Sequence, residues 1–258
     1  MLASHGCWQS ISTALRRLLS PLQTIVLNEH SFYPTSGRWL WKETHQLSLH
    51  TRRFDVRALE DVAARAMGAE PRRGSIRIQK LAEGASNKVF IAIGHGQRAI
   101  IKIPDPVVPA RFVTASEVAT LEYLRTELAI PVPKVFAWST TSDNPVGCEY
   151  IIMEEVPGDA LNVVWPTLEV DKKFTVIDQI VSFQNRLLQG GVELGGYGSL
   201  YFTEDAIALG LPKQLSVAAK TSARFCLGPL AKHEFLDPSV RAAGVNCGPC
   251  KWPRSCQI

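Results

Sequence analysis

Three apolar, β-branched runs follow one another closely between residues 75 and 104. They read SIRIQKLAE, NKVFIAIG and RAIIKIP, and short glycine-containing turns at residues 84–85 and 94–96 separate them. Such runs of β-branched and alternating residues are typical of strands, and connections this short join antiparallel neighbours. The sequence therefore predicts a three-stranded antiparallel meander.

Three other segments show the three- and four-residue spacing of apolar side chains that is typical of amphipathic helices. They are residues 56–66, capped by Asp55, residues 112–128, and residues 170–189, which end at Gly190-Gly191. Helices that accompany an antiparallel sheet place the chain in the α+β class.

The middle helix is expected to bury one apolar stripe, and two extended segments follow it. The prolines of IPVPKVFAW exclude a helix there, and the β-branched residues of CEYIIMEEV predict a final strand. The expected stripe of the helix comprises Val118, Leu121, Leu124 and Leu128.

Composition excludes several classes of protein. Hydrophobic residues make up 46% of the 258 positions and charged residues 20%, which is ordinary for a globular chain. No apolar run approaches the roughly 18 residues of a membrane span. The net charge of +4 reflects mainly the N-terminal segment, not a basic stripe mixed with aromatic residues, so we do not expect nucleic acid as a partner.

The third strand-like run carries a lysine at its centre. Lys102 lies between Ile101 and Ile103, and Glu117 follows fifteen residues later on the predicted helix. A strand lysine paired with a helix glutamate is the arrangement that holds the phosphates of ATP in kinases. Taken singly, a lysine in an apolar strand is more often a sheet-edge residue with its ammonium group in water.

Two further sets of residues extend this pattern. Small residues form the turn between the first two runs, so main-chain amides there can approach phosphate oxygens. Where the final strand ends, main-chain groups of Glu154 and Val156 are expected to hydrogen-bond an adenine, with Met153 beside the ring. The turn residues are Gly84, Ala85, Ser86 and Asn87.

At these residues the chain resembles the aminoglycoside phosphotransferase (choline kinase-like) family and, more narrowly, the fungal group named for altered inheritance of mitochondria protein 9. The resemblance rests on KLAEGASNKVF, AIIKIP, SEVATLEYLRTELAIPVPKVFAW, YIIMEEVPGDAL and GGYGSLYF, and covers about residues 54–235. It implies a protein-kinase-like N-lobe that binds ATP, with magnesium accompanying the nucleotide. It also implies that Lys102 is the phosphate lysine, Glu117 its helix partner and residues 153–156 the hinge between lobes.

The catalytic part of that family has no counterpart here. Its catalytic Asp and Asn, normally on a His-Gly-Asp type loop, and its later metal-binding Asp are missing from these 258 residues, and the string from His233 to Asp237 has the wrong spacing. We therefore expect an N-lobe truncated before the catalytic C-lobe, without catalytic residues: a partial or degenerate phosphotransferase. The alternative is a non-catalytic mitochondrial interaction protein, with a protein partner on the apolar face that a C-lobe would cover.

The N-terminal segment is basic and poor in acids. Residues 1–53 hold six Arg and Lys residues but only Glu29 and Glu43, and an apolar stripe recurs from Trp8 to Leu22. This composition is typical of a mitochondrial presequence, so we expect a mitochondrial protein; a disordered basic extension is the alternative. The predicted division is then 1–53 presequence, 54–156 N-lobe, 157–235 hinge and first C-lobe helices, and 236–258 irregular tail.

The C-terminal cysteines allow two less favoured functions. Cys247-Gly248-Pro249-Cys250 matches a thioredoxin-type string, but it precedes only eight residues, including Pro253, where that motif needs a long helix. A zinc site would need Cys247, Cys250 and Cys256 together with His233, and a single Cys-x-x-Cys is a weak metal signal. Six cysteines in a chain this long do not indicate a disulfide framework.

Overall fold

The computed structural model describes residues 27, 29–35, 38–84, 86–107, 110–211, 215–216, 223–232 and 247–251. Its elements in chain order are η1 (Glu29–Ser31), α2 (Glu43–His50), α3 (Val56–Ala66), β1 (Arg77–Glu83), β2 (Asn87–Gly94), β3 (Gln97–Pro104), α4 (Ala110–Thr126), β4 (Val135–Ser139), β5 (Tyr150–Glu154), α5 (Leu161–Val164), η2 (Trp165–Thr167), α6 (Val170–Leu194), β6 (Ser199–Phe202), α7 (Thr203–Ala208), β7 (Leu215–Ser216) and β8 (Phe225–Gly228).

The main sheet has five strands in the order β1-β2-β3-β5-β4, and every neighbouring pair is antiparallel. Its first three strands form the predicted meander, and β2 occupies the residues that the run NKVFIAIG indicates. A smaller antiparallel sheet has the order β6-β8-β7. The predicted α+β class is confirmed.

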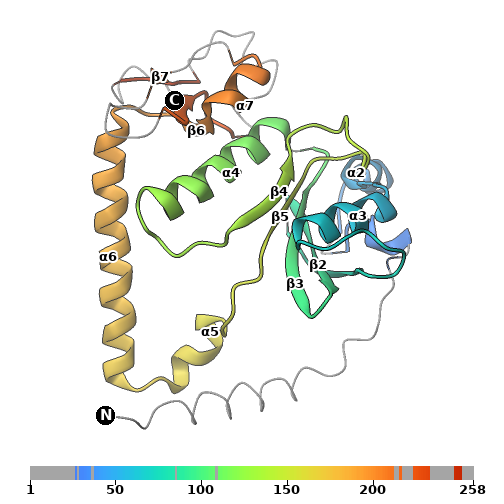
Figure 1. Cartoon of the computed structure of the whole chain (residues 1–258), viewed down its shortest axis with the longest axis horizontal. Coiled ribbons are helices and arrows are strands. Elements are labelled where there is room, and N and C mark those ends of the chain that lie inside the picture. Colours follow the sequence, from blue (N-terminus) through green and yellow to red (C-terminus); the bar gives the residue numbers. More distant parts are fainter. Residues whose placement is uncertain are drawn as a thin grey trace.

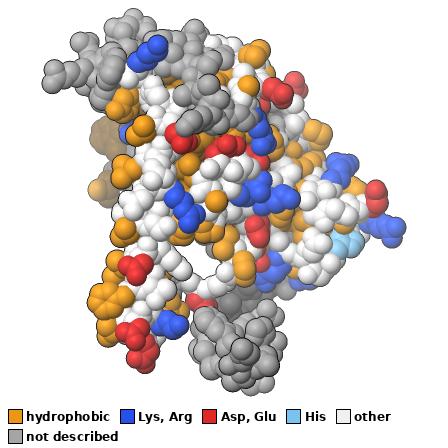
Figure 2. All heavy atoms as spheres, turned by 60° about the vertical axis from the view of Figure 1, so that its left-hand side comes forward, with side chains coloured by type: hydrophobic (Ala, Val, Ile, Leu, Met, Phe, Trp, Pro, Cys, Tyr) orange, Lys and Arg blue, Asp and Glu red, His pale blue; other side chains and the backbone are white. Residues whose placement is uncertain are grey.

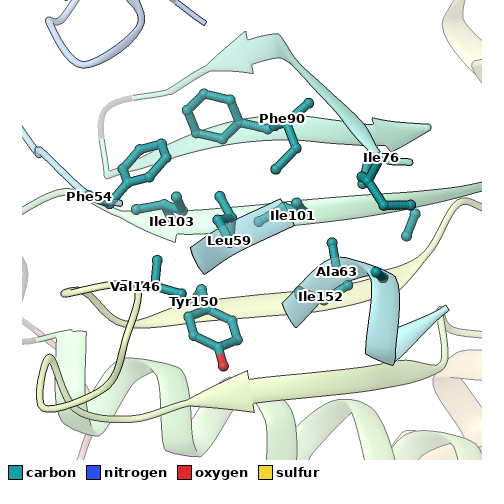
Figure 3. Packing of buried hydrophobic residues seen from close by; sticks show 14 of the residues in the cluster. Phe54, Leu59, Ala63, Ile76, Phe90, Ile101, Ile103, Val146, Tyr150 and Ile152 are labelled. Carbon is teal, nitrogen blue, oxygen red and sulfur yellow. The ribbon is translucent and has the colours of Figure 1, made fainter. Parts of the chain in front are cut away.

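One face of the main sheet is covered by α3 (Figure 1). Asp55 caps this helix as predicted, because its Oδ1 accepts a hydrogen bond of 2.8 Å from the main-chain N–H of Ala58. Figure 3 shows side chains of the helix pointing toward those of the strands, and this interface is the main hydrophobic core. Fully buried members of the core include Leu59, Ala63, Phe90, Ala99, Ile101, Ile103, Val146 and Ile152.

The helix α4 lies between the two sheets (Figure 1). Of the predicted apolar stripe, Val118 is buried and Leu128 packs partly buried against the same cluster, whereas Leu121 and Leu124 stay half-buried. Small residues instead let the helix approach β6 closely, which the apolar spacing alone did not indicate. The buried positions of α4 include Thr114, Ala115, Ser116, Val118, Ala119 and Tyr123.

The helix α6 is longer than predicted. It runs through Gly190 and Gly191 to Leu194, and ends where Gly195 adopts a left-handed conformation with φ of 65°. Gly190 is buried, and a Cβ there would lie 2.7 Å from Cδ2 of Leu128, so packing rather than chain reversal accounts for this glycine. Most of the helix stands away from the sheet (Figure 1).

Residues before Phe54 contact the main sheet. We call the described residues 29–35 and 38–53 the N-terminal strap. The ring of Phe32 packs edge-on against Phe54, with centroids 5.0 Å apart, and Arg52 pairs with Glu149 at 3.2 Å. The apolar stripe from Trp8 to Leu22, on which the presequence prediction depends, lies outside the described residues.

The clash that a side chain would meet at Gly94 leads to a prediction. A Cβ there would lie 2.3 Å from the main-chain oxygen of Ser75 and 2.5 Å from Cδ1 of Ile76. Gly94→Ala is therefore expected to lower the free energy of unfolding by about 1–3 kcal/mol, measured by urea denaturation. Gly191→Ala is the control, because a Cβ there meets nothing within 4 Å and alanine favours a helix by about 1 kcal/mol. Equal stability of the two variants would contradict this packing.

Candidate functional site

Lys102 and Glu117 form an ion pair between the main sheet and α4. Nζ of Lys102 on β3 lies 2.5 Å from both carboxylate oxygens of Glu117 on α4. Their side chains are 21% and 29% exposed, so the pair borders solvent rather than lying in the core. The lysine ammonium group is thus fixed by a bidentate contact, and the side chain keeps partial exposure to solvent.

The strand register places the expected site residues on one face of the sheet. Lys102 pairs with Ile151, and Ile100 pairs with Met153. Side chains alternate between faces along a strand, so Lys102 and Met153 both project from the face opposite α3. Asn87 has the same parity as Val89, which pairs with Lys102, and therefore belongs to this face too. Lys102, Met153 and Asn87 therefore share one face of the sheet.

The predicted phosphate turn joins β1 to β2. The main-chain N–H of Gly84 donates to the carbonyl of Asn87 at 2.9 Å, and the N–H of Asp105 donates to the carbonyl of Ser86, also at 2.9 Å. Ala85 lies outside the described residues. A Cβ on Gly84 would meet no atom within 4 Å, and its φ is not in the left-handed region. The protein fold itself therefore gives no reason for glycine at this position.

At the hinge, one of the main-chain groups expected to bind adenine is already hydrogen-bonded within the protein. The main-chain N–H of Glu154 already donates to the carbonyl of Lys134 at 2.8 Å, and the N–H of Lys134 donates to Oε2 of Glu154 at 3.1 Å. Glu154 can therefore offer an adenine only its carbonyl. Val156 is 59% exposed, and no hydrogen bond of its main chain is found among the described residues. Met153 is partly buried against α4 and β6.

Two residues near the hinge were not anticipated. Arg98 at the start of β3 donates two hydrogen bonds to Glu155, from Nε to Oε2 at 2.6 Å and from Nη2 to Oε1 at 2.8 Å. The pair ties the hinge to the sheet. Its members lie 57 residues apart in the sequence, and no local pattern indicates the contact.

A buried lysine was also missed. Lys88 on β2 is only 1% exposed, and burial lowers its pKa although Asp105 opposes this effect. The alternation of NKVFIAIG did carry a signal, because it places Lys88 on the same face as Phe90 and Ala92. A charged residue at an inward position of a strand indicates a buried partner.

The C-terminal cysteines do not adopt the arrangement of a redox motif. Cys250 is disulfide-bonded and lies in a β-bridge with Tyr197, with main-chain hydrogen bonds of 2.7 and 2.8 Å, whereas a thioredoxin-type cysteine pair opens a helix. Two of the four proposed zinc ligands, His233 and Cys256, lie outside the described residues. Within the described ranges, no group of three His, Cys, Asp or Glu side chains is placed to hold a metal.

No helix among the described residues combines the length and the apolar character that a bilayer crossing requires.

The sequence was compared with known proteins. It matches the Phosphotransferase enzyme family from residue 77 to residue 224. A subtelomeric hrmA-associated cluster protein of Aspergillus fumigatus is 41% identical over 176 residues, which are 67% of this chain and 33% of that protein. Altered inheritance of mitochondria protein 9 of Candida tropicalis is 31% identical over 173 residues, 61% of this chain and 27% of that protein.

Two further proteins match a larger or a smaller share of this chain. The protein of the same name from Yarrowia lipolytica is 28% identical over 249 residues, 86% of this chain and 42% of that protein. A crystal structure assigned to an aminoglycoside phosphotransferase of Ralstonia eutropha is 26% identical, with a TM-score of 0.32, and covers 42% of this chain and 29% of that one. The chain spans about a third of the length of the first of these curated relatives.

The family match contains the strand lysine, the helix glutamate, the turn and the hinge, and extends over more than half of the sequence. The chain therefore belongs to the phosphotransferase enzyme family.

Proposed function

We propose that the main sheet and α4 form the nucleotide-binding half of an ATP-dependent phosphotransferase. The observation that carries this proposal is the contact of 2.5 Å between Nζ of Lys102 and both carboxylate oxygens of Glu117. In kinase-like enzymes this ion pair fixes the lysine that neutralises nucleotide phosphates, and it must be formed for the site to work. The same sheet face also carries Asn87 of the turn and Met153 of the hinge, which supports the proposal.

Each element has a distinct part in binding. Lys102 contacts the α- and β-phosphates, and Glu117 keeps its ammonium group in place. The open space at Gly84 lets phosphate oxygens approach the main chain of the turn. At the hinge, the N–H of Val156 and the carbonyl of Glu154 bind the adenine edge. Magnesium accompanies the nucleotide and neutralises phosphate charge when bound.

These residues account for binding but not for the transfer step. The 258 residues contain no His-x-Asp-x-x-x-x-Asn segment, which would supply a catalytic base and a metal ligand. We therefore propose that this chain by itself binds Mg-ATP weakly and does not transfer phosphate. The half-site exposes one side of the nucleotide to water, which reduces the apolar area buried on binding.

The first prediction concerns the lysine. Isothermal titration of the full chain with Mg-ATP is expected to give weak binding that Lys102→Ala reduces at least tenfold, because a phosphate contact by a charged donor is lost. Glu117→Gln is expected to weaken binding less, since it loosens the lysine without removing it. Lys172→Ala, an exposed position on α6, serves as the control.

The same preparations test the absence of transfer. Incubation with Mg-ATP and a range of hydroxyl acceptors is expected to yield no phosphorylated product by mass spectrometry. Product that forms with the parent chain and is lost in Lys102→Ala would show that the chain is a complete enzyme. Equal titration curves for the parent chain and Lys102→Ala would disprove the nucleotide site.

A second prediction separates ligand contact from folding at the turn. Gly84→Ala adds a methyl group where no protein atom lies within 4 Å, so the free energy of unfolding is expected to stay the same or rise by up to about 1 kcal/mol. Mg-ATP affinity is nevertheless expected to fall severalfold, since the methyl group occupies the space for phosphate oxygens. A variant with unchanged affinity would exclude the turn from the phosphate site.

A non-catalytic interaction protein is the second candidate, and α6 favours it. Large apolar side chains on this helix are exposed, including Phe174 at 61%, Leu188 at 69% and Val192 at 82%. Figure 2 shows hydrophobic side chains at the surface along the helix. Such a stripe is more apolar than a free surface helix usually is. Absence of Mg-ATP binding, together with a protein that co-purifies with the chain from its own cells, would favour this function.

We also propose that the protein is mitochondrial. The N-terminal composition supports import, and the relatives from Candida tropicalis and Yarrowia lipolytica carry the word mitochondrial in their names. The strap contacts limit what processing can remove without loss of packing. N-terminal sequencing of protein recovered from mitochondria is expected to find a new terminus before Glu29. Recovery of the chain only from the cytosol would contradict import.

A further inference from the structure

The N-terminal strap contacts the main sheet on both sides of the phosphate turn. On the β1 side, it reaches Glu83, the residue directly before Gly84. The main-chain N–H of Thr35 donates to Oε1 of Glu83 at 2.9 Å, and its hydroxyl donates to Oε2 at 2.9 Å. Lys80 also pairs with this carboxylate. Three donors thus fix the last side chain of β1.

The charge state of Glu83 agrees with these contacts. Burial alone would raise its pKa, but the hydrogen bonds from Lys80 and Thr35 outweigh burial and hold the pKa below its usual value. The ionised form is therefore stabilised by Lys80 of β1 and by Thr35 of the strap. The pKa of Glu83 is lower in the folded protein than in the unfolded chain, so its ionisation stabilises the fold. This stabilisation is fully present above the unfolded pKa and is lost as the pH falls through the folded pKa.

On the β2 side, the strap reaches Lys88, the residue directly after Asn87. Nζ of Lys88 donates to the carbonyl of His50 at 3.1 Å, the last residue of α2. Oδ2 of Asp105 lies 3.8 Å from the same Nζ, and Glu83, Lys80 and Arg52 are further charged groups near Lys88. The strap carbonyl is therefore the closer of these two oxygens, and a buried ammonium group without it would be costly.

Asp105 connects this cluster to the turn itself. Its Oδ1 lies 3.1 Å from Nδ1 of His50, and its main-chain N–H donates to the carbonyl of Ser86. The guanidinium of Arg52 adds a contact from Nε to the carbonyl of Pro104 at 3.4 Å. Through these contacts the end of the strap holds the β3 segment that pairs with the turn.

We propose that the N-terminal strap positions the phosphate turn by fixing Glu83 before it and Lys88 and Asp105 after it. This inference rests on the proposed nucleotide site and adds to it a positioning element that lies outside residues 77–224, the region of the family match. Loss of a strap contact frees one arm of the turn, so its main-chain amides no longer hold a fixed geometry for phosphate.

The test first measures the turn without nucleotide. Amide hydrogen exchange of Gly84 and Asp105, whose N–H groups bond to Asn87 and Ser86, is followed by NMR in the full chain. Thr35→Val and His50→Ala are expected to raise these exchange rates about tenfold, which corresponds to the loss of one side-chain hydrogen bond. Thr35→Ser keeps the hydroxyl and is expected to restore slow exchange.

A matched control lies within the strap. Glu43 pairs with Arg38 at 2.8 Å on the exposed side of α2, so Glu43→Gln removes a strap carboxylate without contact to the sheet. It is expected to leave exchange at Gly84 and Asp105 unchanged. Exchange that is unaffected by Thr35→Val and His50→Ala, or raised equally by Glu43→Gln, would overturn the proposal. Thr35 is exposed, so its variant is expected to remain folded.

The second measurement is Mg-ATP affinity of the same variants. Thr35→Val and His50→Ala are expected to weaken binding about tenfold in parallel with exchange, whereas Glu43→Gln and Thr35→Ser are not. Faster exchange with unchanged affinity would overturn the positioning role while leaving the nucleotide site intact. If the parent chain does not bind Mg-ATP, the proposed function is wrong, and so is the role of the strap in phosphate binding. The exchange rates would still show whether the strap orders the turn.

Discussion

The alternation of side chains along β3 is the constraint on which the rest of the structure depends. Ala99, Ile101 and Ile103 are completely buried against α3, while Lys102 projects from the opposite face toward α4. A shift of one residue in register would place the lysine in the main core and an isoleucine at the site. The same pairing that builds the core therefore fixes the position of the proposed phosphate lysine.

The contact between Lys102 and Glu117 fixes the position of the lysine side chain more than it stabilises the fold. Both side chains are partly exposed, and ion pairs of this kind contribute only about 0–1 kcal/mol to folding. Stability comes instead from the apolar layers on either side of the pair. Loss of part of this contact would therefore cost the fold little free energy.

Local patterns predicted much of the scaffold. The meander, the cap at Asp55 and the start of α6 follow from the spacing of apolar residues, turns and caps, all of which act within a few residues. The proximity of Lys102 and Glu117 was expected from the kinase-like pattern of a strand lysine and a helix glutamate, and the structure brings the two together. The assigned roles of these residues stay predictions until nucleotide binding is measured.

The remaining features depend on contacts between distant segments. Thr35 and Glu83 lie 48 residues apart, and His50 and Lys88 lie 38 apart, so no periodicity relates them. The main-chain donor of Glu154 is taken by the carbonyl of Lys134, a result of strand pairing that the hinge sequence does not reveal. The buried face of α4 likewise depends on the second sheet, which the apolar spacing could not indicate.

The place of α4 between two sheets limits how the site can be regulated. Many kinase-like sites are switched off by a helix that swings outward and separates its glutamate from the lysine. Here Val118 and Tyr123 pack against the second sheet, and the ring of Tyr123 lies 5.5 Å from that of Phe225. Glu122 on the same helix also pairs with Arg224 at 3.1 Å. An outward swing of α4 would therefore also break its contacts with β6, β8 and Arg224.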